Sequence, residues 1–178
     1  MAMQYDVSSI HLNSTGFGYM GRTRVKGLVV TSAGGTGGTV GIWDTDTALV
    51  SATYEQAGTL VTVTKSAHGL VTGQRVGLSF GVASGNSATN GNYTITVLTS
   101  STFTVTDINS RTIAAGTACS YVANTATGNS TQWHATFDIP AFAGCTNIVF
   151  PGEGILIENA LYLTLTPTYI TAVTAFYG

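Results

Sequence analysis

Residues 60–65, 93–98 and 102–107 read LVTVTK, YTITVL and TFTVTD, and these runs decide the fold class. In each of them apolar side chains alternate with polar ones, mainly threonine, which is the pattern of a β-strand with one buried face. Two neighbouring runs, RVGLSF at 75–80 and TACSYV at 117–122, repeat the pattern, and glycine-rich turns separate the runs. The five short strands predict a small β-barrel or β-meander in the middle of the chain.

Strands of a second kind are predicted on both sides of this central module. Residues 24–31 (RVKGLVVT) alternate in the same way and precede a glycine-rich turn, and residues 132–139 (QWHATFDI) begin a further set of strands. The sequence therefore predicts an all-β fold. Its main part is an antiparallel, jelly-roll-like β-sandwich of residues 1–55 and 124–178, into which residues 56–123 are inserted.

The first part of the chain has a different texture. Residues 1–23 carry isolated apolar side chains among Ser, Asn and Gly, without a helical period. Two interpretations fit this pattern: an extended arm that packs on a neighbouring subunit, and a poorly ordered terminus.

The composition limits the classes of function. Of the 178 residues, 44% are hydrophobic and only 8% are charged, which excludes a disordered chain. The net charge of −2 argues against nucleic-acid binding, because phosphate contacts need clustered Lys and Arg. So few charges would leave strand edges unprotected in a monomer, so we expect partner subunits to cover them.

The lack of a recognisable targeting signal and the isolated cysteines favour a protein that stays in the cytosol. No run approaches about 18 apolar residues and no signal-peptide pattern is present, so we expect neither a membrane span nor export. Cys119 and Cys145 are isolated, and both are predicted to be reduced and buried.

The titratable residues do not form a recognisable catalytic or metal-binding motif. His11, His68 and His134 lie in separate segments, and His68 in Ala-His-Gly-Leu is best interpreted as a turn residue. Asp44 and Asp46 have a spacing that calcium loops use, but the rest of such a loop is missing, which favours an Asx-type turn. We therefore expect no metal, no cofactor and no enzymatic activity.

Two motifs carry a resemblance to known families. The run VTKSAHGLVTGQRV at 63–76, followed by NGNYTI at 90–95 and STFTV at 101–105, resembles a β-module that recurs in head and tail accessory proteins of tailed phages. The run IVFPGEGILI at 148–157, with LYLTL at 161–165, resembles small phage structural β-sandwich proteins. The resemblance implies a structural protein of the virion, assembled in the host cytoplasm.

The leading interpretation is a capsid decoration (cement) protein that stabilises the assembled head. Its expected partners are the major capsid protein lattice and further copies of itself, as a homotrimer, and neither nucleic acid nor membrane. The predicted subunit or lattice contacts are aromatic and basic residues near the N-terminus: Tyr5, Phe17, Tyr19, Arg22, Arg24 and Lys26. The alternative is a tail-fibre or spike-associated adhesin that contacts host glycan through Tyr93, Tyr121 and Trp133.

Overall fold

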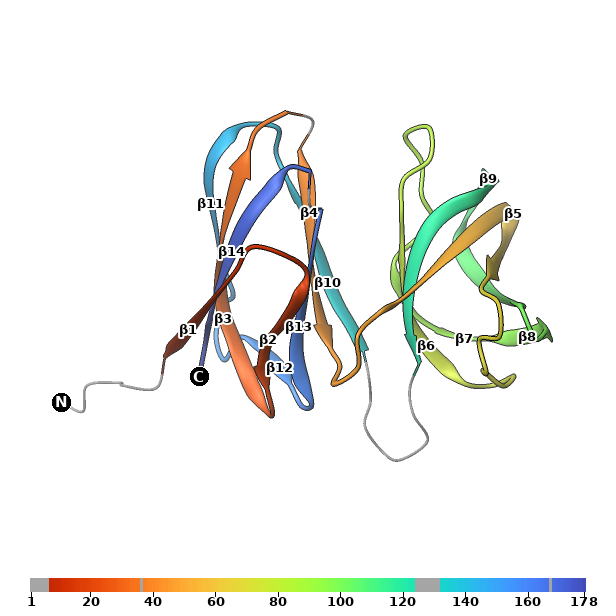
Figure 1. The fold of residues 1–178 in the computed structure, drawn as a ribbon, viewed down its shortest axis with the longest axis horizontal. Helices are drawn as coiled ribbons and strands as arrows, with labels where there is room; N and C mark the ends of the chain where they lie inside the picture. The colour runs from red at the N-terminus through yellow and green to blue at the C-terminus, as the bar shows by residue number, and fades with distance from the viewer. Residues whose placement is uncertain (1–6, 36, 124–131, 167) are drawn as a thin grey trace. The chain divides into compact units, whose positions relative to one another are not determined.

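The computed structural model describes residues 7–35, 37–123, 132–166 and 168–178. The described residues form an all-β fold of three antiparallel sheets, which confirms the predicted fold class. The chain divides into two compact units, Met1–Asp46 with His134–Gly178 and Thr47–Trp133 (Figure 1). We call the first unit the sandwich and the second the insert.

The sandwich consists of two sheets that enclose one apolar core. The first sheet has the order β1 (Ser8–Leu12), β14 (Ile170–Tyr177), β3 (Thr23–Ala33) and β11 (Ala143–Val149), and β12 (Ile155–Ile157) also pairs with β3. The second has the order β10 (Gln132–Ile139), β4 (Gly38–Asp44), β13 (Ala160–Leu165) and β2 (Gly16–Met20). Alternate residues of these strands are buried between the sheets, among them Leu28, Val30, Ile42, Leu163 and Val173.

The N-terminal residues contribute to this sandwich, so the prediction of an extended arm is wrong for the residues that the structure describes. β1 pairs with β14 of the same unit, with Ile10 opposite Ala175, and β2 pairs with β13. The missed signal is a strand pattern of only five residues in each case, interrupted by Asn and Ser, which is too short to separate from an irregular segment.

The insert is built on two long strands. β5 (Val50–Thr64) and β9 (Thr102–Ala123) pair from Val50 opposite Tyr121 to Thr64 opposite Thr102, with two register shifts, and β6 (Arg75–Phe80), β7 (Gly91–Thr94) and β8 (Thr96–Thr99) complete the sheet. Its core contains several aromatic rings, including Tyr54, Phe103 and Tyr121.

β9 replaces two separate short strands, 102–107 and 117–122, that the sequence predicted. Gly58, with a φ of 67°, lies next to an irregularity in the β5–β9 register. A bulge bends a strand without ending it, because one extra residue is accommodated while pairing continues on either side. The predicted boundary after residue 55 consequently falls inside β5.

Candidate functional site

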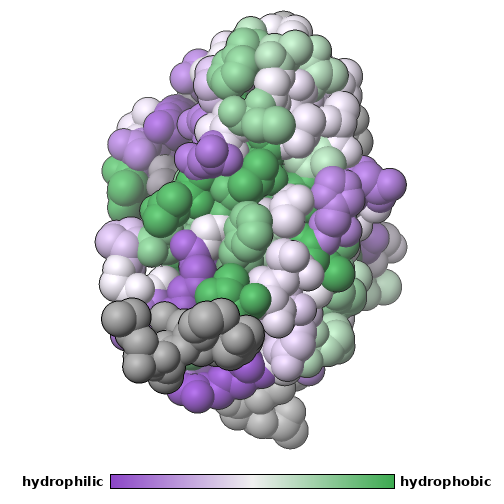
Figure 2. Space-filling model, turned by 90° about the vertical axis from the view of Figure 1, so that its left-hand side faces the viewer, coloured by the Kyte–Doolittle hydropathy of each residue, from purple (hydrophilic) through white to green (hydrophobic). Residues whose placement is uncertain are grey.

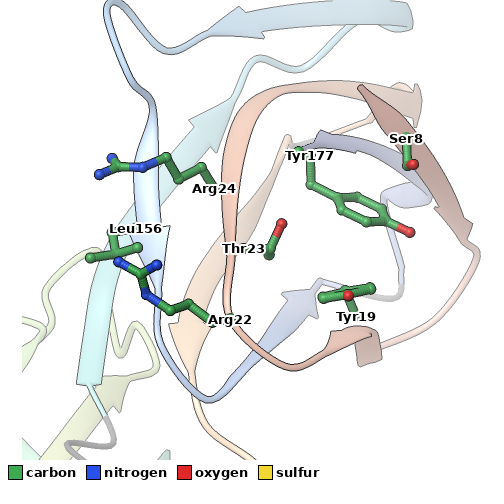
Figure 3. A pocket seen from close by; sticks show the side chains of 8 residues that line it. Ser8, Tyr19, Arg22, Thr23, Arg24, Leu156 and Tyr177 are labelled. Atoms are coloured by element: carbon green, nitrogen blue, oxygen red, sulfur yellow. The ribbon is translucent and has the colours of Figure 1, made fainter. Parts of the chain in front are cut away.

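An open pocket of about 440 Å³ lies at one end of the sandwich, where β1, β2, β3, β12 and β14 meet (Figure 3). Seven side chains line it, together with Gly178: Ser8, Tyr19, Arg22, Thr23, Arg24, Leu156 and Tyr177. We call it the arginine pocket.

Backbone hydrogen bonds hold the walls of the arginine pocket in place. Gly21 turns the chain from β2 into β3 with a φ of 120°, and its N–H donates to the carbonyl of Asn159 at 2.8 Å. Arg24 and Gly178 exchange two backbone hydrogen bonds of 3.2 and 3.0 Å, which extend the pairing between β3 and β14 beside the pocket. Arg24 therefore projects from a strand that is paired on this side, and Arg22 from the turn that precedes it.

The pocket has a cationic side and an aromatic side. Figure 3 shows the side chains of Arg22 and Arg24 on one side of β3 with Leu156, and those of Tyr19 and Tyr177 on the other. The two tyrosine rings contact each other, with centroids 4.9 Å apart. Within the described part of the chain, neither guanidinium makes an ion pair or a side-chain hydrogen bond.

The lining of the pocket suits the binding of an anion. The side chains that line the pocket include no carboxylate, imidazole or thiol. A guanidinium can donate two parallel hydrogen bonds to a carboxylate or phosphate, and tyrosine faces supply apolar contact area. The pocket is therefore equipped to hold an anionic group next to an apolar one.

The structure gathers three of the six predicted contact residues in this pocket: Tyr19, Arg22 and Arg24. Lys26 lies further along β3, where its ammonium donates to the carbonyl of Glu153 at 3.2 Å. Phe17 packs edge-on against Tyr162, with ring centroids 4.8 Å apart.

The sixth predicted contact residue, Tyr5, lies outside the described residues. Sequence reasoning missed Leu156 and Tyr177, which complete the pocket. No local pattern marks them, because the pairing of β3 with β12 and β14 brings them there from more than 130 positions away.

The outer face of the first sheet is a second candidate surface. The strand register places Val29, Phe176, Asn147 and Val149 on this side, and a groove of about 340 Å³ runs between them beside Gly27. Figure 2 shows hydrophobic residues through the centre of this side of the molecule. Lys26 also lines the groove. We call the part of this surface formed by the uncharged residues Val29, Phe176, Asn147 and Val149 the uncharged face.

The three residues predicted to contact glycan do not form a surface site. Tyr121 is only 3% exposed and its ring packs against Phe103, so it cannot contact a sugar. The hydroxyl of Tyr93 donates to the carbonyl of Thr89, and burial raises the pKa of Tyr93 to about 12. The prediction of this contact set is therefore wrong, because the alternation of the strands turns Tyr121 into the core.

Trp133 is fixed through its backbone. Its N–H donates to the amide oxygen of Asn92, and its carbonyl accepts from the amide nitrogen of the same side chain, both at 3.0 Å. The amide of Asn92 thus makes the same pair of hydrogen bonds with the backbone of Trp133 that a residue of a neighbouring strand would make.

The prediction that His68 is a turn residue is confirmed. Its Nδ1 accepts a hydrogen bond from the N–H of Leu70 at 3.0 Å, and its Nε2 lies 3.0 Å from the carbonyl of Thr99. These contacts require the Nε2-protonated ring, since Nδ1 is the acceptor. Gly69 supplies the positive φ of 67° that the turn needs.

The carboxylate of Asp44 binds a loop that is distant in sequence. Asp44 is buried and accepts hydrogen bonds from the N–H groups of Glu158, Asn159 and Ala160, at 2.8, 2.8 and 3.3 Å. Among the described residues, no group of three or more His, Cys, Asp or Glu side chains is placed to hold a metal ion. Asp44 therefore positions the start of β13.

A second buried carboxylate holds a loop of the insert. Asp107 accepts hydrogen bonds from Gln56 at 3.3 Å and from the N–H groups of Thr89 and Asn109 at 3.0 and 3.2 Å. Burial alone would raise the pKa of Asp107, but these hydrogen bonds prevail and lower it. Arg111 also binds this loop, at the carbonyl of Ser87.

The two cysteines are free, and they differ in environment. Cys119 is buried in the insert core, and burial raises the pKa of its thiol to about 12, so it is inert. Cys145 is exposed beside the uncharged face, 3.7 Å from the hydroxyl of Thr31, so the prediction of a buried side chain is wrong for this residue. Because β11 is the last strand of its sheet, Cys145 has a neighbouring strand, β3, on one side only.

The comparisons with known proteins give no relative. No family model, curated protein or solved structure matches the chain. In the part of the chain that the structure describes, no helix is long and apolar enough to cross a membrane.

Proposed function

We propose that this protein is a non-catalytic structural subunit that binds an assembled protein lattice through its sandwich, as a capsid decoration protein of a phage head does. The observation that carries the proposal is the arginine pocket, in which Arg22 and Arg24 have no acidic partner among the described residues. The phage assignment itself comes from the sequence resemblance.

The positive charges of the pocket would be neutralised by a partner molecule. The chain has only six Lys and Arg residues, and two of them, Arg22 and Arg24, line one pocket, across β3 from Tyr19 and Tyr177. Arg and Tyr are the residue types that dominate binding energy at protein interfaces. A carboxylate on the partner would gain charge-assisted hydrogen bonds from the two guanidinium groups.

Stabilisation of the lattice then follows from mass action. A subunit that binds the assembled lattice and not its dissociated parts favours assembly, by about 2.7 kcal/mol per site at a free concentration of about 100 Kd. Neither an active site nor a bound cofactor is needed for this activity.

The test is to incubate purified protein with undecorated phage heads and measure co-sedimentation and the heat resistance of the heads. We expect saturable binding with many copies per head and a higher disruption temperature. The double substitution Arg22→Ala with Arg24→Ala should weaken binding by about 2 kcal/mol or more, because truncated interface arginines have effects of this size.

Arg75→Ala is the matched control, because Arg75 is an exposed arginine on β6 of the insert. It should bind as the wild-type protein does. Absence of any binding to heads would refute the proposal, and equal binding by the double variant would refute the role of the pocket. Binding to whole host cells without binding to heads would instead support the adhesin interpretation.

A further inference from the structure

The outer edge of β11 is an unpaired strand edge. β11 is the last strand of its sheet and pairs only with β3 among the described strands. The N–H of Phe150 donates to the carbonyl of Lys26 on β3, so the alternate residues 148, 146 and 144 also face β3. The N–H and C=O groups of residues 143, 145, 147 and 149 therefore face outward.

This edge lacks the features that normally prevent strand pairing between molecules. Its sequence, AGCTNIV, contains no charged residue and no proline. The opposite edge strand of the same sheet, β1, has five residues, whereas β11 has seven. Val149 at its end is 80% exposed, next to the groove of the uncharged face.

A buried hydroxyl on the same strand has no partner. The Oγ1 atom of Thr146, at the centre of β11, is buried without a hydrogen-bond partner in the described structure. A buried hydroxyl without a partner is unfavourable by about 1–3 kcal/mol, so a native position of this kind requires an explanation. Thr146 faces the sandwich interior, since it pairs with Val30, whose side chain is in the core.

We propose that β11 pairs antiparallel with β11 of a second copy of this chain, about a two-fold axis that passes beside Thr146. An antiparallel strand edge is complementary to itself under a two-fold rotation, so the second copy is the partner that the geometry itself supplies. The register with complete overlap pairs residue 143 with residue 149 of the second copy, 145 with 147, and 146 with 146. The four outward-facing residues of each strand then form the hydrogen-bonded pairs.

This register accounts for the features of the edge. Thr146 lies opposite Thr146 of the second copy at a non-hydrogen-bonded pair, where side chains are closest and paired threonines can hydrogen-bond to each other. The exposed Val149 lies against Ala143 of the second copy. The first sheets of the two copies join into one continuous sheet, and their uncharged faces become contiguous.

The two-fold contact predicts a dimer, or an assembly built of dimers, and not the simple trimer expected at the sequence level. It does not depend on the proposed capsid function: a dimer that fails to bind heads refutes only that function, and a monomer that binds heads refutes only the edge contact.

Cysteine cross-linking tests the register directly. In a Cys145→Ser background, Thr146→Cys should form an intermolecular disulfide under mild oxidation, because the Cα atoms of a non-hydrogen-bonded pair are about 4.5 Å apart and disulfides span about 4.4–6.8 Å. The matched control is Asn147→Cys in the same background. It should stay unlinked, because residue 147 lies opposite residue 145, and two residues 147 are offset by about 7 Å along the strands.

The second measurement is the oligomeric state of the full chain by analytical ultracentrifugation over a range of concentrations. We expect a dimer whose dissociation constant rises about 30-fold in Asn147→Pro, which removes one outward-facing N–H from each copy. Proline is tolerated at such edge positions, and circular dichroism would check that the fold is kept.

A wild-type protein that is monomeric at all concentrations up to its solubility limit would overturn the proposal. So would cross-linking of the Asn147→Cys control in place of the Thr146→Cys variant. If Asn147→Pro does not fold, the cross-linking pattern of the two cysteine variants still decides the question.

Discussion

The sandwich and the insert differ in how they satisfy their polar groups. In the insert, Asp107, Arg111 and His68 all bind backbone or side-chain groups of the insert itself. In the sandwich, by contrast, Arg22 and Arg24 have no acidic partner and Thr146 has an unpaired hydroxyl, among the described residues. The insert also has one buried atom without a partner, Oε1 of Gln56, so the contrast is one of degree: among the described residues, the sandwich has more groups that another molecule could satisfy.

The largest expected effect is on the stability of the insert, through its core. Phe103 is fully buried, and Phe103→Ala should lower the free energy of unfolding of the insert by about 3–5 kcal/mol through the cavity it leaves. Limited proteolysis with mass spectrometry should show cleavage confined to residues 47–133. Equal loss of protection in the sandwich would mean that the two units unfold together and would break the comparison.

The carboxylate of Asp44 is the corresponding test in the sandwich. Asp44→Ala leaves three N–H groups without an acceptor, and we expect a loss of about 3 kcal/mol in the free energy of unfolding of the sandwich. Urea denaturation, followed by the fluorescence of Trp43 in β4, measures it. A loss below about 1 kcal/mol would show that the loop before β13 does not depend on this carboxylate.

Asp107 gives the insert a dependence on pH. Because the pKa of Asp107 is lowered in the folded state, its stabilising contribution is complete above the ordinary value of 3.8 and is lost as the pH falls through the lowered value. Asp107→Asn should destabilise the insert by about 2 kcal/mol at pH 7, and the difference from wild type should shrink below pH 3.8. A difference that stays constant across this range would contradict the assigned role.

His68 should produce the smallest effect. His68→Ala removes the acceptor for the N–H of Leu70 and the contact with Thr99 in a partly exposed turn, at an expected loss of about 1 kcal/mol. Thermal unfolding of the insert measures this loss. The loss should be independent of added zinc. A loss that changes with zinc would contradict this role and would indicate that His68 binds a metal ion.

Features that depend on a short sequence period could be predicted from the sequence. Features that depend on the pairing of strands far apart in the chain could not. Alternation located β6 at residues 75–80, and His68 in Ala-His-Gly-Leu was predicted as a turn residue. Gly58, in contrast, lies at a bulge inside a strand, and a local pattern does not distinguish a bulge from a turn. The arginines were singled out from their spacing, but Tyr177 reaches them only through the pairing of β14 with β3.

The pairing of Val50 with Tyr121 has a consequence for the order of folding. The two ends of the insert lie side by side once it is folded, at about the 5 Å separation of paired strands. While the insert is still unfolded, it forms a flexible loop of about 70 residues between the two parts of the sandwich. Closing such a loop costs roughly 2 kcal/mol more than closing a loop of a few residues. We therefore expect the insert to fold first and the strands of the sandwich to pair afterwards.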